Sequence, residues 1–359
     1  MRENLYDAQY NLTYKLRLSK LRKRIPVFDK WGIEPLPSII NITSGVKCAI
    51  IGTLFVSSNL KPSIFKELSG NNKEMLSYCS ESNKYFLEDD TGRIEVQFED
   101  TLPRGIWPVT GMVVGLLGQE INNGKFIASD ISIPGYIRPI DSKGNGIICL
   151  ISGLELSAHT TIKLKILLDY INGCFTTPIN ITEFILLGNT ATNISDFDTI
   201  CPYFNKKITI IPDLKDPSSN IFPIQPLHKK LFKYSIESFS NPSFVTIGKK
   251  SFLFCSNIFV KDLIKYNPDM DYLSAMEFLL QLQCVGPTAP DTIMCTPSID
   301  KPDFIIENGV NYFILSSEST FVHRKFNNTS LFCLPKFSRT GEVIILNLED
   351  DSYKIIKVE

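Results

Sequence analysis

The sequence feature that most constrains the fold is a change in the apolar pattern near Pro139. Before this point, short runs of β-forming residues are separated by turn sequences. After it, longer apolar runs alternate with helical patterns. Short strands with frequent turns are typical of a small barrel or sandwich, whereas long apolar strands that alternate with helices are typical of α/β sheets buried on both faces. The 359 residues are enough for two such domains.

The first half contains a clear hairpin sequence. Residues 84–88 and 93–98 have strand patterns, and Asp89-Asp90-Thr91-Gly92 between them is a turn sequence. Further strands are predicted at residues 46–56, 109–118 and 125–128. Residues 40–140 are therefore predicted to form one small barrel or sandwich.

The second half is predicted to be α/β. Strands are expected at residues 146–151, 183–187, 207–211, 243–256, 303–315 and 342–357, with helices near 159–171, 226–238 and 271–284. In such folds the loops after the carboxyl ends of the strands carry the chemistry. Here the first three of these loops contain Ser152-Gly153-Leu154, Gly188-Asn189 and Pro212-Asp213. Residues 139–146 are predicted to join the two domains.

The N-terminal residues 5–24 favour a helix. Tyr10, Tyr14, Leu18 and Leu21 recur at helical spacing, although the alternation of nearby leucines leaves a strand as the competing prediction. Pro26 is expected to end the helix.

A basic run follows on the same segment. It contains Lys20, Arg22, Lys23 and Arg24. Such a run can serve nuclear import or contact DNA, but the preferred interpretation is the solvated face of a helix.

Composition excludes several classes of protein. The net charge of -1 disfavours a protein that coats DNA, because phosphate contacts require clustered lysine and arginine. Nine cysteines without a Cys-x-x-Cys pair indicate reduced thiols in an intracellular protein. The polar N-terminus predicts no signal peptide, and no apolar run has membrane-spanning length.

Aromatic residues in the predicted barrel could in principle stack on single-stranded nucleic acid. They are Tyr85, Phe86, Phe98 and Phe126. Acidic residues surround them and would repel phosphate, namely Glu88, Asp89, Asp90, Glu95, Glu99 and Asp100. These aromatics are therefore predicted to pack in a core.

Six short motifs occur in order along the chain. They are Gln9-Tyr10 with Tyr14, Arg17-Leu18, Leu21-Arg22 and Trp31; Tyr85 to Arg93; Thr110-Gly111 with Gly118 and Gly124-Lys125-Phe126; Asp216-Pro217 with Pro223 to His228; Pro287-Thr288-Ala289-Pro290-Asp291-Thr292; and Pro335 to Ser338. Together they resemble the small (B) subunits of DNA polymerase delta, and the hexapeptide from Pro287 to Thr292 is the most specific match. The chain departs from that family at Cys284, where a histidine is usual nearby, at Pro212-Asp213-Leu214, and at Phe254 to Asn257.

The resemblance implies an OB-fold joined to a calcineurin-like phosphoesterase domain, an α/β/β/α sandwich. Active phosphoesterases of this type hold two metals with Asp-x-His, Gly-Asp and Gly-Asn-His motifs, because two cations must activate water and stabilise the leaving oxygen. The corresponding positions here are Ser152 and Leu154, then Asn189, then Asp213. Serine and leucine cannot replace an anionic bridging ligand. The resemblance therefore implies no metal site, no cofactor and no catalytic residues.

The histidines agree with this interpretation. The chain has three, His159, His228 and His323, and none has a partner at ligand spacing. Nucleotide-binding and serine-hydrolase motifs are absent from the sequence. Asp291 is predicted to cap or brace the turn of its motif, whose two prolines fix the backbone.

The function implied by the resemblance is that of a non-catalytic scaffold. Three segments are predicted: an N-terminal helical segment (1–36), an OB-fold (40–140) and an inactive phosphoesterase-like domain (146–359). The implied partners are the C-terminal metal domain of the catalytic subunit, a third accessory subunit and, indirectly, the sliding clamp, with weak or indirect DNA contact, no membrane, and nuclear location. Two alternatives stay open: the small subunit of polymerase alpha or epsilon, and an active metal-dependent phosphodiesterase or nuclease.

Overall fold

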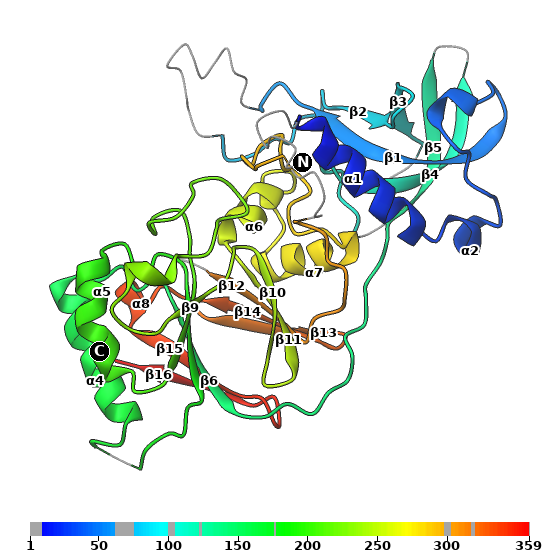
Figure 1. Ribbon diagram of the computed structural model, residues 1–359. Coiled ribbons are helices and arrows are strands. Elements are labelled where there is room, and N and C mark those ends of the chain that lie inside the picture. The colour runs from blue at the N-terminus through cyan, green and yellow to red at the C-terminus, as the bar shows by residue number, and fades with distance from the viewer. Residues whose placement is uncertain are drawn as a thin grey trace, which may run out of the picture. The chain divides into compact units, whose positions relative to one another are not determined.

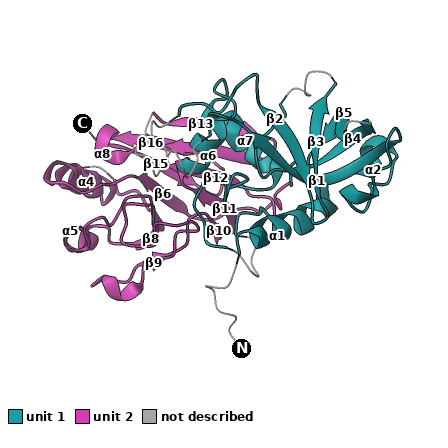
Figure 2. Ribbon diagram, turned by 90° about the horizontal axis from the view of Figure 1, so that it is seen from above, with its two compact units in different colours: residues 1–137, 258–307 teal, residues 138–257, 308–359 magenta. Residues whose placement is uncertain are grey.

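The computed structural model describes residues 9–61, 75–99, 105–121, 124–175, 177–297, 303–316 and 320–358. The chain forms two compact units (Figure 2). Unit 1 contains residues 1–137 and 258–307, and unit 2 contains residues 138–257 and 308–359. Residues 258–307, which belong to the predicted segment 146–359, thus pack with residues 1–137. The exact limits of the three predicted segments stay a prediction.

Unit 1 begins with the predicted N-terminal helix. Helix α1 (Asn11–Leu21) continues into the 3₁₀ turn η2 (Arg22–Arg24), and the short helix α2 (Val27–Trp31) follows Pro26. Residues 5–8 of the predicted helix lie outside the described residues. The buried side of α1 consists of Thr13, Arg17, Leu18 and Leu21, so it combines polar and apolar contacts.

Five strands of unit 1 form a closed barrel (Figure 1). They are β1 (Lys47–Ser57), β2 (Lys84–Glu88), β3 (Arg93–Phe98), β4 (Val113–Ile121) and β5 (Lys125–Ser132), in the order β1-β2-β3-β5-β4. Leu54 of β1 and Leu87 of β2 are register partners, and both are completely buried, as is Phe126 of β5. A Cβ at Gly118 would lie 2.0 Å from the carbonyl oxygen of Ile127, so glycine is needed where β4 meets β5. A five-stranded barrel of this kind is an OB-fold, as predicted.

The second stretch of unit 1 contains helices α6 (Asn257–Ile264) and α7 (Tyr272–Leu282). The predicted helix α7 is capped at its N-terminus by Asp271, whose carboxylate accepts a hydrogen bond from the Ser274 amide. Between α7 and the end of unit 1 lies the loop that carries Pro287 to Thr292. The 3₁₀ turn η3 (Ile39–Asn41) completes the regular elements of the described part of this unit.

Unit 2 contains two sheets packed face to face (Figure 1). The six-stranded sheet has the order β16-β15-β6-β7-β8-β9, and the five-stranded sheet has the order β10-β11-β12-β14-β13. The strands are β6 (Ile147–Ser152), β7 (Glu183–Leu187), β8 (Lys207–Ile211), β9 (Glu237–Ser238), β10 (Ser243–Ile247), β11 (Lys250–Cys255), β12 (Tyr312–Ser316), β13 (Val322–Phe326), β14 (Thr329–Leu334), β15 (Glu342–Asn347) and β16 (Tyr353–Lys357).

Alternate residues of the same strands build two different cores. In β6, Ile148 and Leu150 join a cluster that includes Phe252 and Phe332 of the other sheet, so this cluster fills the space between the sheets. Cys149 and Ile151 join a second cluster on the opposite face, which we call the outer core. Helices α4 (Ala158–Ile171) and α5 (Ile194–Ile200) cover that face. The predicted fold class, an OB-fold with a two-sheet α/β sandwich, is confirmed.

The helix predicted near residues 226–238 is wrong. This stretch contains only the 3₁₀ turn η5 (Lys229–Leu231) and the short strand β9. Its apolar side chains Leu227, Phe232 and Ile236 are buried in the outer core, but their spacing does not place them on one helical face. In an extended backbone each of these side chains can reach the outer core separately, and β9 can pair in parallel with β8.

Two predicted single strands are hairpins. Residues 243–256 form β10 and β11, joined at Gly248 and Lys249, whose φ angles of +53° and +68° suit a tight hairpin turn. Residues 342–357 form β15 and β16. Of the strand predicted at 303–315, only the last four residues belong to a regular strand, β12, which extends to Ser316.

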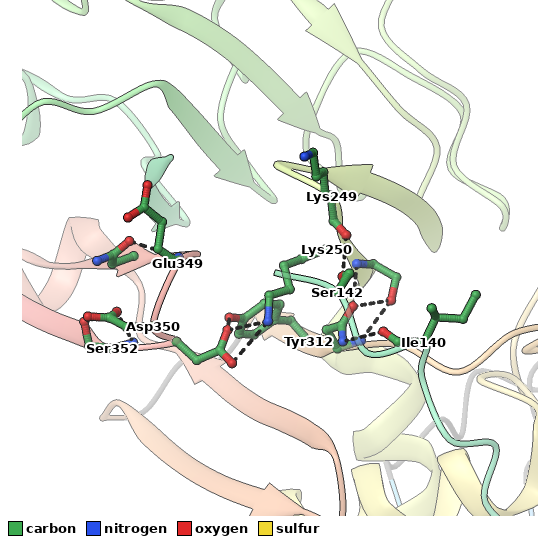
Figure 3. Close-up of polar contacts among 12 residues, drawn as sticks. Ile140, Ser142, Lys249, Lys250, Tyr312, Glu349, Asp350 and Ser352 are labelled. Carbon is green, nitrogen blue, oxygen red and sulfur yellow. Dashed lines mark hydrogen bonds and ion pairs between the residues drawn. The ribbon is translucent and has the colours of Figure 1, made fainter. Parts of the chain in front are cut away.

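The chain enters unit 2 along the predicted joint, residues 139–146, which is fixed by polar contacts (Figure 3). The Ser142 hydroxyl donates to the carbonyl oxygen of Lys249 at 2.7 Å. Next to it, Lys250 forms an ion pair with Asp351 at 2.9 Å, and the Tyr312 hydroxyl donates to the same carboxylate. The entry segment is therefore tied to the β10–β11 turn, beside the β15–β16 turn.

Candidate functional site

A small polar pocket lies at the carboxyl ends of the strands of unit 2. Ser152, Leu187 and Ser316 end β6, β7 and β12, while Asp213, Asn257 and Lys336 follow β8, β11 and β14 by two residues. Both sheets therefore contribute to it. Its complete lining is Ser152, Gly153, Leu187, Gly188, Asn189, Asp213, Asn257, Ser316 and Lys336. This is the edge at which α/β sheets bind their ligands.

Asp213 provides the one carboxylate among the lining residues that the structure describes. Its oxygens accept hydrogen bonds from the Ser256 hydroxyl at 2.8 Å and from the Leu214 amide at 2.9 Å. A Cβ at Gly188, where φ is +69°, would lie 3.3 Å from the carboxylate. Asp213 is thus held against the loop after β7 and is only 8% exposed.

Asp216 fixes the two loops behind this carboxylate. It accepts hydrogen bonds from the amides of Ala191 at 2.7 Å and Asp213 at 2.8 Å, so it joins the loop after β7 to the loop after β8. Burial raises the pKa of Asp216 to about 6, against the lowering effect of these backbone bonds.

A lysine, Lys336, brings a positive charge to the lining of the pocket. The Lys336 Nζ lies 3.5 Å from Glu155 Oε1, and Lys215 Nζ lies 2.8 Å from the same atom. Burial would raise the pKa of Glu155, but the bond from Lys215 and the charge of Lys336 hold it below its ordinary value. The side chain of Lys336 is 17% exposed, and its ammonium group would repel a metal ion bound nearby.

Ser152 and Leu154, the two residues that correspond to the Asp-x-His motif, lie in different places. Ser152 lines the pocket, and its hydroxyl is buried without a hydrogen-bond partner among the described residues. Leu154 is completely buried in the outer core with the residues of α4. The structure therefore brings together Ser152, Asn189 and Asp213 from the sequence-based set and places Leu154 elsewhere.

The histidines do not line this pocket. His159 is exposed at the start of α4, and His228 caps η5 by accepting a hydrogen bond from the Lys230 amide at 3.2 Å. His323 lies on β13, with its ring 4.5 Å from that of Phe332. Within the described part of the chain, no group of three or more histidine, cysteine or acidic side chains is arranged to hold a metal.

In unit 1, Arg17 connects the PTAPDT loop, Pro287 to Thr292, to α1 and the barrel. Its guanidinium donates hydrogen bonds to the carbonyl oxygens of Gly111 (3.0 Å), Gly286 (3.2 Å), Pro287 (2.6 Å) and Ala289 (2.6 Å). Arg17 is only 3% exposed. At Gly111, where φ is +85°, a Cβ would lie 1.9 Å from the Pro287 carbonyl oxygen, so the barrel and the loop meet there backbone to backbone.

Two acidic side chains hold the rest of this loop. The Asp291 carboxylate accepts from Lys61 Nζ at 2.8 Å, and the same ammonium donates to Thr110 Oγ1 at 2.6 Å. The Thr292 hydroxyl donates to Asp262 of α6 at 2.5 Å. These bonds fix the loop within unit 1.

The basic run after α1 is engaged within unit 1. Arg22 donates to the carbonyl oxygens of Leu36 and Pro37 at 2.7 and 2.8 Å. Arg24 donates to the Gln283 side chain and the Ile306 carbonyl, both at 2.8 Å, and Lys20 lies 3.6 Å from Glu307. Lys23 is the member of the run for which the described residues show no such bond.

The barrel aromatics divide into inner and outer residues. Phe126 is completely buried, and Tyr85 packs edge-on against Phe98 with ring centres 5.6 Å apart. Phe86 is half-buried, and the Arg93 guanidinium lies 3.9 Å from the centre of its ring. The outer ring face is therefore already covered by a cation of the same chain.

Comparison with known proteins agrees with these observations. Residues 9–131 match the family model for the DNA polymerase delta subunit OB-fold domain, and residues 191–323 match that for the B subunit of DNA polymerase alpha/epsilon. The DNA polymerase delta small subunit of Arabidopsis thaliana is 27% identical over 97% of this chain and 91% of that protein. That of Saccharomyces cerevisiae is 25% identical over 99% and 90%. The chain belongs to the DNA polymerase delta small-subunit family.

A third relative in this small-subunit family is DNA polymerase delta subunit 2 of Drosophila melanogaster, which is 26% identical over 96% of this chain and 92% of that protein. Among solved structures, an archaeal phosphodiesterase superposes on 58% of this chain with 12% identity and a TM-score of 0.34. Vps29 of Entamoeba histolytica superposes on 59% with 10% identity and a TM-score of 0.33. In the described part of this small-subunit chain, no helix is both long and apolar enough to cross a membrane.

Part of the pocket in this small subunit was not predicted from the sequence. Asn257, Ser316 and Lys336 come from the five-stranded sheet, and Glu155 approaches from the loop after β6. The available signal was their position, since each of the first three ends or follows an apolar strand. Lys336 also lies in the Pro335–Ser338 motif that carries the family resemblance.

Proposed function

We propose that this chain is the non-catalytic scaffold subunit of a DNA polymerase delta. In this proposal it binds the C-terminal metal domain of the catalytic subunit, bridges to a third accessory subunit, serves the sliding clamp indirectly, and acts in replication and repair synthesis in the nucleus. Family membership over nearly the whole chain supports this role.

The observation that carries the non-catalytic part of the proposal is the pocket in unit 2. A dinuclear site needs several carboxylate and imidazole ligands around two cations. Asp213 is the one carboxylate among the described lining residues, and both of its oxygens accept bonds from the protein. Lys336 adds a positive charge at the same place. The residues present therefore do not fit a pair of metal ions.

The barrel supports only a weak or indirect role in DNA binding. Phe86 and Phe55 are both covered by Arg93, at 3.9 and 4.8 Å from the ring centres, and Lys61 lies 4.9 Å from that of Phe55. A nucleobase would have to displace these cations before it could stack. We expect weak binding to oligo-dT, and tight binding that falls steeply with salt would contradict this part of the proposal.

Purification of the tagged chain from native extract tests the scaffold role. We expect the delta catalytic subunit to co-purify in roughly equal amount and to resist high salt, as in an obligate complex. Recovery of the alpha or epsilon catalytic subunit would favour the alternative that the second family model names. Recovery of no polymerase subunit would refute the scaffold role.

Metal content and phosphodiesterase activity test the non-catalytic role separately. We expect less than one tightly bound transition metal per chain and no hydrolysis of a model phosphodiester in the presence of manganese. Two bound metals together with hydrolysis that is lost in Asp213→Asn would establish the enzymatic alternative. The matched control is Asp169→Asn, a substitution on the half-exposed side of α4.

A further inference from the structure

Helix α4 of unit 2 is apolar on its outer side as well as its inner side. Its inner residues Leu164, Leu167, Leu168 and Ile171 are buried in the outer core. On the opposite side, Ile162 is 59% exposed and Ile166 is 44% exposed. These two residues are one turn apart and therefore form a continuous apolar ridge.

A second segment extends this ridge sideways. The 3₁₀ turn η4 (Cys201–Tyr203) lies beside α4, where Asn172 donates a hydrogen bond to the Tyr203 carbonyl oxygen at 3.0 Å. The Tyr203 side chain is 40% exposed, and Lys165 Nζ lies 4.8 Å from the centre of its ring. Helices α4 and α5 lie together at one flank of unit 2 in both views (Figures 1 and 2).

The charges beside the ridge indicate what could cover it. Lys163 and Lys165 lie on either side of Ile162 and Ile166, and neither forms an ion pair within the described part of the chain. Asp169, one turn further along, is the single acidic residue of α4. The border of the ridge therefore carries excess positive charge, which favours a partner with acidic side chains.

We propose that the outer side of α4, formed by Ile162, Ile166, Tyr203, Lys163 and Lys165, binds an amphipathic helix of a partner protein. The apolar side chains of that helix pack on the i, i+4 ridge, and acidic side chains next to them pair with the two lysines. This inference does not depend on which polymerase the chain serves.

The experiment uses the full chain and two labelled designed helical peptides. Both peptides carry leucine at positions i, i+4 and i+7, one with glutamate and one with lysine at the flanking positions. We expect fluorescence anisotropy to show about tenfold tighter binding of the glutamate peptide, equivalent to about 1.4 kcal/mol. The double substitution Lys163→Glu and Lys165→Glu should reverse this preference.

The apolar part is tested by Ile162→Ser with Ile166→Ser, which should abolish binding of both peptides and leave thermal stability unchanged, because both side chains are exposed. The control is Ile355→Ser on β16, where the isoleucine is also 44% exposed, and it should bind as the wild type does. Unchanged binding by the double serine variant, or no reversal by the double glutamate variant, would overturn the proposal. Concentration-dependent dimerisation that the serine variant abolishes would instead make a second copy of this chain the occupant.

Discussion

Replacing Arg17 with alanine should be one of the most destabilising single changes in unit 1. The guanidinium is 3% exposed and donates to four carbonyl oxygens, three of which belong to the loop at residues 286–289. Alanine leaves these oxygens without a donor and opens a space where the side chain was. The change therefore acts on α1, the barrel and the loop at once.

The expected magnitude follows from these contacts. A hydrogen bond to a charged group contributes about 1.5–3 kcal/mol, but four bonds from one group are not additive, and the removal of a buried charge returns part of its desolvation cost. We therefore expect a loss of about 3–5 kcal/mol in the free energy of unfolding. For a unit of this size that corresponds to a melting temperature lower by roughly 6–20 °C.

Calorimetry and chemical unfolding measure this loss, and hydrogen exchange of the amides of residues 286–292 locates it. Arg17→Lys should be intermediate, because one ammonium group keeps the charge but cannot reach all four oxygens. Arg93→Ala, which removes a guanidinium with 45% side-chain exposure, should cost less than about 1 kcal/mol. An Arg17→Ala chain within about 0.5 kcal/mol of the wild type would refute the reasoning.

Three further predictions concern single positions. Gly111→Ala should cost more than about 3 kcal/mol in urea unfolding, since its Cβ would lie 1.9 Å from the Pro287 carbonyl oxygen. The control Gly124→Ala, with φ +70° and open space around it, should cost about 1–2 kcal/mol, and equal losses would contradict the prediction. Because the pKa of Asp216 is raised to about 6, this carboxyl binds more protons in the folded chain than in the unfolded chain between about pH 4 and 6. Its effect should therefore be a loss of stability as pH rises through that range, by up to about 1.4 kcal/mol per pH unit. The variant Asp216→Asn should lack this component of the stability–pH curve. Burial lowers the pKa of His323, so the folded chain favours the neutral imidazole. The contribution of His323 to stability should be complete above about pH 6.5 and decline as pH falls towards the folded-state pKa. The free energy of unfolding of His323→Phe should therefore differ less between pH 7.5 and pH 5 than that of the wild type.

The sequence predicted those elements whose signals are local. The strands at 84–88, 93–98, 183–187 and 207–211 were placed correctly because turn residues or apolar limits bound each of them. The hairpins at 243–256 and 342–357 were each predicted as a single strand. In the first of them only the two turn residues Gly248 and Lys249 separate two β patterns, so the patterns look continuous. Helix α5, which is seven residues long, was missed, and so were α6 and the β13–β14 hairpin.

The pocket was only half predictable. Ser152, Asn189 and Asp213 could be found because they end or follow strands that are neighbours in both sequence and sheet. Lys336 lies far along the chain, and it reaches the same place because β14 ends at the same edge of the sandwich. The role of Arg17 was equally hidden, since its acceptors at Pro287 and Ala289 are 270 and 272 residues away. Contacts over such separations depend on topology and leave no local pattern.

The two-part composition of unit 1 has a consequence for biosynthesis. Its first stretch ends at Ile137, and its second begins only at Ile258. At ordinary translation rates, the 270 residues between Arg17 and Pro287 take on the order of 15–50 s to synthesise. During that time the nascent barrel exposes the surface that residues 258–307 later cover, and Arg17 has one of its four acceptors, Gly111. Chains that end before residue 258 should therefore remain with this surface exposed, which makes them natural clients of chaperones and of quality-control proteases.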